Sequence, residues 1–157
     1  MRVGVGYDVH PLREGRALII GGVRIEHPTG LDGNSDADVL THAVIDSVLG
    51  AAGLGDIGAH FPPDDARYRG ASSLVLLAEA SKVVATAGFR VVNIDSTVVA
   101  QAPRLGSHLG GMARNIARAL GLDIAAVSVK ATSPEGIGAL GAGEGIAAHA
   151  VALIDET

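Results

Sequence analysis

The 157-residue sequence predicts an α/β (α+β) fold, in which a mixed, mostly four-stranded sheet carries helices on one face. Strand-like and helix-like segments follow the order β-β-α-α-β-α-β-β. The last of these segments, 146–154, is apolar on both sides, so the second sheet face must be covered too, and oligomerisation is the simplest cover. Because the length is typical of one domain, we expect residues 1–157 to form a single domain.

The first strand-like segment has an apolar side and a side with glycines and two potential metal ligands. Its residues alternate with the two-residue period of a strand, as the order Val3, Gly4, Val5, Gly6, Tyr7, Asp8, Val9, His10 shows. Asp8 and His10 point the same way on a strand and can hold one cation between them. The glycines leave room for a ligand or for another backbone. For an isolated Asp-x-His, however, an exposed strand end is the simpler interpretation.

The other elements follow from hydrophobic periodicity and from turn residues. Residues 17–25 read as a strand, in which Gly21-Gly22 marks a bulge or a close approach of another backbone. The polar loop 30–38 leads into a helix over 37–50, capped by Ser35 or Asp36. The remaining expected elements are a helix over 71–87, a strand over 90–101, a helix over 104–120 and strands over 125–132 and 145–154.

The first helix carries a polar stripe, because Asp38, His42 and Asp46 are spaced four residues apart. A solvated helix face is one interpretation of this stripe. In the other, His42 binds a metal, and Asp38 or Asp46 accepts a hydrogen bond from its second ring nitrogen. Asp8, His10 and His42 together would leave an open fourth position on zinc, as a catalytic site requires.

Composition excludes several other kinds of protein. There are no cysteines, so a metal must be held by His, Asp or Glu. The net charge of −5 and the lack of a basic stripe argue against a nucleic-acid partner. Neither a leader nor a membrane-spanning apolar run is apparent, so we expect a soluble, cytoplasmic protein without a membrane partner. The irregular loop 53–65, with Phe61 and three acids, suits a binding lid, although Phe61 could instead pack into the core.

Six short motifs, in their order and spacing, resemble the 2-C-methyl-D-erythritol 2,4-cyclodiphosphate synthase family. They are Gly-Tyr-Asp-Val-His at 6–10, Ser-Asp-Ala-Asp-Val at 35–39 with His42, Gly-Leu-Gly-Asp-Ile-Gly at 53–58, Ala-Gln-Ala-Pro-Arg at 100–104, Lys-Ala-Thr-Ser-Pro-Glu at 130–135 and Gly-Glu-Gly-Ile-Ala at 143–147. Each motif alone is weak, but the whole set spans nearly the entire chain and is highly specific.

The resemblance implies a lyase of the non-mevalonate isoprenoid pathway. Such an enzyme converts 4-diphosphocytidyl-2-C-methyl-D-erythritol 2-phosphate into 2-C-methyl-D-erythritol 2,4-cyclodiphosphate and CMP. It implies a homotrimer with active sites shared between subunits. The alternatives are a low-activity or non-catalytic trimeric binder of nucleotide or phospho-sugar, and a zinc-dependent hydrolase. Against the hydrolase, the sequence has no positioned general base such as a His-Glu-x-x-His helix.

The resemblance also assigns site residues. Asp8, His10 and His42 would bind Zn²⁺, and Glu135 would help to hold a Mg²⁺ or Mn²⁺ ion that bridges the substrate diphosphate. Asn34 and Ser133 would be catalytic. The other substrate-binding positions would be Ser35, Asp56, Ile57, Gly58, Phe61, Asp65, Ala100, Gln101, Ala102, Pro103, Arg104 and Thr132, with Asp8, His10, Asn34, Ser133 and Glu135 also meeting substrate.

Four positions depart from the usual pattern of the family. Asn34 stands where His is usual, at a position associated with stabilising the transition state, and Pro63 stands where Asp is usual. Ala139 and Ala142 replace a common Phe and Arg. None of the four belongs to the expected zinc ligands.

Overall fold

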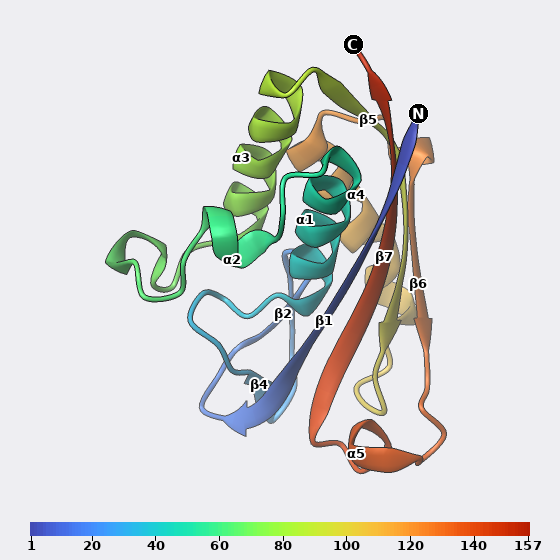
Figure 1. Ribbon diagram of the computed structural model, residues 1–157. Coiled ribbons are helices and arrows are strands. Elements are labelled where there is room, and N and C mark those ends of the chain that lie inside the picture. The colour runs from blue at the N-terminus through green and yellow to red at the C-terminus, as the bar shows by residue number, and fades with distance from the viewer.

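The computed structural model describes all of residues 1–157 and is built around a five-stranded sheet of order β4-β1-β7-β5-β6 (Figure 1). The strands are β1 (Arg2–Glu14), β4 (Thr29–Leu31), β5 (Phe89–Val99), β6 (Val127–Thr132) and β7 (Gly145–Glu156). Only β5 and β6 pair in parallel, so the predicted mixed sheet is confirmed. The predicted count of four strands is wrong, because the three-residue β4 is too short to show a hydrophobic period.

Three long helices lie on one side of this sheet, as predicted (Figure 1). They are α1 (Val39–Ala52), α3 (Ser73–Thr86) and α4 (Leu109–Leu120), and the short helices are α2 (Ile57–His60), α5 (Gly138–Gly141), η1 (Ala66–Tyr68), η2 (Gly106–His108) and η3 (Ile124–Ala126). The helix expected from residue 104 begins only at Leu109, after the η2 turn. No helix here combines the length and the hydrophobicity that crossing a bilayer requires.

The segment 17–25 is not one bulged strand but a hairpin of β2 (Leu18–Ile20) and β3 (Val23–Ile25). Gly21 and Gly22 both adopt positive φ, +55° and +68°, which suits the tight turn of a two-residue hairpin. The Asp38 carboxylate accepts hydrogen bonds from both glycine N–H groups, at 2.8 and 2.7 Å. It also caps α1 by accepting from Thr41 N, so Asp38, rather than Ser35 or Asp36, is the N-cap.

The helix-facing side of β1 allows α1 to approach the sheet closely. A β-carbon on Gly4 would lie 2.1 Å from the Ser47 carbonyl oxygen, and one on Gly6 would lie 1.8 Å from that of Ala43. These glycines therefore make room for another backbone, as one of the two sequence interpretations expected. The aliphatic core that fills the rest of this layer includes Leu40, Ile45, Leu49, Leu77, Ile94, Ile116 and Ile146.

The opposite side of the same strand is apolar and exposed. Val3 is 67% exposed, Val5 71%, Tyr7 52% and Val9 46%, and Val151 on the neighbouring β7 is 43% exposed. Large β-branched and aromatic side chains on a sheet normally pack against a second layer. No second layer covers this face within one chain, and its covering by oligomerisation stays a prediction.

Candidate metal centre and active site

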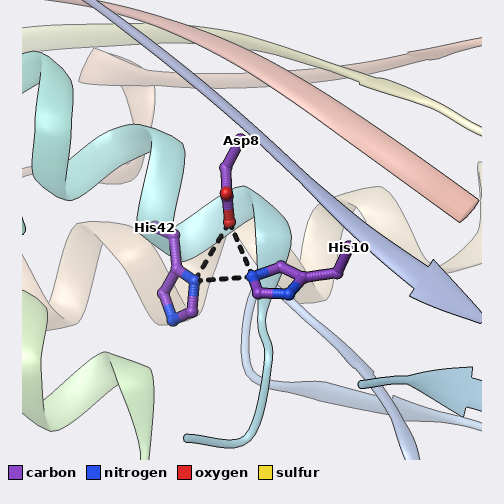
Figure 2. Close-up of side chains that lie close together, drawn as sticks. All are labelled: Asp8, His10 and His42. Atoms are coloured by element: carbon purple, nitrogen blue, oxygen red, sulfur yellow. Dashed lines mark hydrogen bonds and ion pairs between the residues drawn. The ribbon is translucent and has the colours of Figure 1, made fainter. Parts of the chain in front are cut away.

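Asp8, His10 and His42 converge on one point between β1 and α1 (Figure 2). The Asp8 Oδ2 atom lies 2.9 Å from His10 Nε2 and 3.0 Å from His42 Nδ1, and the two ring nitrogens are 3.2 Å apart. The strand period places Asp8 and His10 on the same face, and α1 supplies His42 across the layer. The predicted grouping of these three residues is confirmed.

The three ligand atoms are electrostatically coupled. Burial alone would raise the pKa of Asp8, but hydrogen bonds and charge interactions with His10 and His42 outweigh it and lower the pKa from 3.8 to about 2. Burial likewise opposes the protonated form of His10, yet Asp8 and the backbone carbonyl of Asp32 raise the pKa of this imidazole above 6.5. A cation is therefore favoured at this point of the molecule.

Each imidazole is oriented by a partner on its far side. His10 Nδ1 lies 2.9 Å from the Asp32 carbonyl oxygen, which can only accept, so this nitrogen carries the proton and Nε2 is free for a metal. On His42, Nδ1 faces the centre, and Nε2 faces Ser73 Oγ at 2.8 Å and Ser35 Oγ at 3.1 Å. Two imidazoles and a carboxylate around an open position form a donor set that fits catalytic zinc.

The predicted partner of His42 is wrong. Asp38 is turned toward the β2–β3 hairpin, and the Asp46 carboxylate accepts from Ile57 N at 2.7 Å instead. Burial raises the pKa of both carboxyls, against the lowering effect of their backbone hydrogen bonds. The observed partner is Ser73, 31 residues along the chain, and no local spacing in the sequence could have indicated it.

A cavity of about 250 Å³ opens beside the metal centre and brings many of the predicted site residues together. Phe61 lines it and packs edge-on against Tyr68 with ring centroids 5.4 Å apart, so Phe61 both borders the cavity and contacts the core. The residues that line the cavity are Asp8, His10, Asn34, Ser35, His42, Ile57, Gly58, Phe61, Pro63, Tyr68 and Leu76.

Two predicted substrate carboxylates lie beside this cavity without lining it. Asp56 caps α2 by accepting from Ala59 N at 3.0 Å. Asp65 caps η1 and forms an ion pair with Arg67 at 2.6 Å, and hydrogen bonds from Arg67 lower the pKa of Asp65. Within one chain, both carboxylates therefore hold the loop in shape.

Most of the remaining predicted substrate residues line a different cavity, of about 680 Å³, which shares no residue with the first; Ala102 is not among its lining residues. Its lining includes Ala100, Gln101, Pro103, Arg104, Thr132 and Ser133. Glu135 belongs to the turn at this end, where its N–H donates to Ser133 Oγ, and it is not part of the Asp8 group. One chain thus divides the expected site into two halves.

Comparison with known proteins decides the family. The model of the YgbB family matches residues 1–155. The chain belongs to this family. The curated 2-C-methyl-D-erythritol 2,4-cyclodiphosphate synthase of Desulfosudis oleivorans is 60% identical to this YgbB-family chain over 156 residues, which cover 99% of this chain and 93% of that protein. The resemblance inferred from the motifs is confirmed.

Solved structures agree with this YgbB-family assignment. The bifunctional IspDF from Campylobacter jejuni has a TM-score of 0.95 and 42% identity, and the match covers 99% of this chain and 42% of that longer chain. A 2C-methyl-D-erythritol-2,4-cyclodiphosphate synthase in its CDP-bound form has a TM-score of 0.89 and 36% identity, with 98% of this chain and all of that chain covered.

Two of the positions that depart from the usual family pattern touch each other. The Asn34 side-chain amide donates a hydrogen bond to the Pro63 carbonyl oxygen. The backbone of the same loop is held by Gly70 N, which donates to Asn34 O at 3.0 Å. Asn34 therefore fastens the segment around Pro63 to the wall of the metal-side cavity.

Proposed function

We propose that this protein converts 4-diphosphocytidyl-2-C-methyl-D-erythritol 2-phosphate into 2-C-methyl-D-erythritol 2,4-cyclodiphosphate and CMP, as a cytoplasmic enzyme formed by residues 1–157. The observation that carries the proposal is the Asp8-His10-His42 cluster, which opens into a cavity large enough for a phosphorylated polyol. The names of its relatives, at 60% and 58% identity over 99% of the chain, support the same activity.

The reaction needs positioning more than it needs a protein nucleophile. An oxygen of the substrate's own 2-phosphate forms a bond to the β-phosphorus, and the bond from that phosphorus to the CMP phosphate oxygen breaks. CMP leaves with the electron pair. Asp8, His10 and His42 would hold a zinc ion, which when bound would supply Lewis-acid screening of the phosphate charges. The chain's own residues hold the two phosphates in contact and exclude water, which lowers the entropic part of the barrier.

We assign the remaining roles by the same proposal. Ser35, Ile57, Gly58 and Phe61 would contact the methylerythritol phosphate on the metal side. The segment 100–104, with Thr132 and Ser133, would hold the cytidine and its phosphates. Glu135 would help to hold a second divalent ion between the phosphates, for which a carboxylate is a suitable ligand.

We further infer a homotrimer in which two neighbouring copies complete each active site. Two observations support this assembly. The two halves of the expected site line separate cavities in a single chain, so one substrate would need a cavity from each of two copies. The outer sheet face also exposes Val3, Val5 and Val151, which a second copy would bury.

The direct test is incubation of the purified protein with the cytidyl substrate, Zn²⁺ and Mg²⁺, followed by phosphorus NMR of the products. The expected result is CMP together with the cyclic diphosphate. CMP together with an open-chain bisphosphate would indicate the zinc-dependent hydrolase instead, because water would then have attacked the β-phosphorus. Substrate binding without CMP release would indicate a non-catalytic binder, which no observation here favours.

A further inference from the structure

The side of His42 that faces away from the metal centre is held by a buried serine. Ser73 is the first residue of α3 and is fully buried. Its Oγ atom lies 2.8 Å from His42 Nε2, the ring nitrogen opposite the metal-facing Nδ1. A buried hydroxyl at this distance forms a hydrogen bond, and its direction decides which tautomer His42 adopts.

Asp36 determines that direction. Its Oδ1 atom accepts a hydrogen bond from the Ser73 hydroxyl, and its Oδ2 atom accepts from Ser73 N at 2.9 Å. An ionised carboxylate can only accept, so the single hydroxyl proton of Ser73 points to Asp36. Ser73 Oγ must then accept from His42 Nε2–H, which in the neutral ring leaves the lone pair of Nδ1 directed at the metal centre.

We propose that Ser73 and Asp36 are positioning residues that hold His42 in the tautomer that binds zinc through Nδ1. The inference rests on the proposed zinc site. A partner that accepts the outer N–H of a metal-binding imidazole fixes the ring and makes its other nitrogen a stronger donor. Here the chain of hydrogen bonds ends on a charge, which strengthens each bond in it.

Ser35 is the other hydroxyl near His42 Nε2, and it is the weaker partner. Its Oγ atom is farther away, at 3.1 Å, and it accepts from Ala37 N at 3.2 Å. It borders the cavity and has no carboxylate behind it. Ser35 therefore serves as a matched control, since its removal deletes a hydroxyl near the same nitrogen without breaking the chain of bonds to Asp36.

The same contacts tie His42 to the loop over the cavity. Ser73 follows directly after the irregular segment that contains Phe61 and Pro63, and Asp36 N donates to Ala71 O at 3.2 Å. The Ser73–Asp36 pair thus joins the end of this segment to the loop before α1. Movement of this segment would therefore shift the His42 imidazole through its buried hydrogen bond with Ser73.

The test is the zinc affinity of the full chain, measured by competition with a chromophoric chelator, for the parent, Ser73→Ala, Asp36→Asn and Ser35→Ala. We expect Kd for zinc to rise about 10–100-fold in Ser73→Ala and in Asp36→Asn. Ser35→Ala should stay within about threefold of the parent. The Co²⁺-substituted protein should show altered visible absorption in the first two variants only.

Zinc affinities within threefold of the parent in both Ser73→Ala and Asp36→Asn would overturn the inference. An equal loss in Ser35→Ala would overturn it as well, because any nearby hydroxyl would then suffice. A parent that binds no zinc would instead refute the proposed metal site. If Ser73→Ala does not fold, Asp36→Asn, which preserves the shape of the side chain, decides the result alone.

Discussion

The two faces of β1 differ in side-chain size and in burial. The face toward α1 carries Gly4 and Gly6, followed by Asp8 and His10, and its glycines are buried against helix backbone. The other face carries four large apolar side chains that are between 46% and 71% exposed. One face of β1 is therefore packed within a single chain, and the other face is left exposed by it.

The difference shows how packing distance selects residue size. At Gly4 and Gly6 the strand has no side chain toward α1, because the carbonyl oxygens of Ser47 and Ala43 occupy the space that a side chain would need. Away from α1 it has β-branched residues, which pack well against a second layer. The metal ligands lie where the glycine face ends, so the close contact between β1 and α1 also brings His42 to Asp8.

The largest effect is expected from filling the glycine face. Gly6→Val should prevent folding or lower the free energy of unfolding by more than about 4 kcal/mol, because its side chain would overlap the α1 backbone. Circular dichroism during urea unfolding measures this. Gly50→Ala is the control: it lies on α1, where a β-carbon meets only Val5 O at 4.0 Å, and it should stabilise by roughly 0.5–1 kcal/mol. Normal stability of Gly6→Val would show that α1 does not lie this close.

Removing a metal ligand should abolish activity while the fold remains. His42→Ala should lose zinc and nearly all turnover, because two remaining ligands rarely hold zinc tightly, and the aliphatic core does not depend on the metal. Metal analysis after dialysis measures the bound zinc, and sedimentation measures whether the folded assembly remains. His27→Ala, in the β3–β4 connection and outside the Asp8-His10-His42 group, should retain zinc. Stoichiometric zinc in His42→Ala would refute its role, and unfolding on chelation of the parent would make the site structural.

Charging the outer face should separate the copies without unfolding them. Val5→Asp places a carboxylate on a side chain that is 71% exposed in one chain, so a single copy tolerates it, but a buried contact between copies would not. Sedimentation velocity should show monomers, and activity should fall because each site would lose its second half. Val75→Asp, on α3 at 59% exposure, should leave the assembly intact. A Val5→Asp protein that remains trimeric would place the interface elsewhere.

The next prediction concerns Asn34, whose side chain donates to the Pro63 carbonyl oxygen at the metal-side cavity. Asn34→His introduces a group that can become a cation, which should strengthen a hydrogen bond to a phosphate in the transition state by ~1.5–3 kcal/mol and raise kcat about tenfold or more. The pH profile of kcat should gain an ionisation. An unchanged or lower kcat would mean that the hydrogen bond from Asn34 to the Pro63 carbonyl matters more than an added charge.

The smallest effect is a pH dependence that, around the raised pKa of His10, has opposite signs with and without zinc. Zinc needs neutral imidazoles, so its affinity should fall as pH drops below the raised pKa of His10, by about tenfold per unit for each displaced proton. In the metal-free protein, the lowered pKa of Asp8 contributes stability above pH 3.8 that is lost toward about 2. The raised pKa of His10 contributes stability below pH 6.5 that is lost as pH rises through its folded value. Chelator competition and thermal unfolding at several pH values measure both, and parallel trends around the raised pKa of His10 would contradict this account.

Much of the fold and the central part of the site could be predicted from the sequence, because both depend on local periodicity. The strand period placed Asp8 beside His10, and the helical period placed His42 on a helix that could face them. The roles of the substrate residues and the homotrimer came only from the family resemblance and stay predictions. The predicted partner of His42 was wrong, because residues one turn apart on a helix share a face but need not touch.

By itself, the sequence determined the order of the main elements, the aliphatic core and three metal ligands, since hydrophobic periods and ligand spacings are properties of short segments. Only the tertiary structure decided that β4 joins the sheet and that Ser73 rather than Asp38 holds His42. Both depend on contacts between distant segments, whereas the hairpin at Gly21-Gly22 is a local pairing that the glycine pair could have indicated. These contacts follow from how α1 and α3 pack on the sheet, and a pattern within a short segment cannot predict that packing.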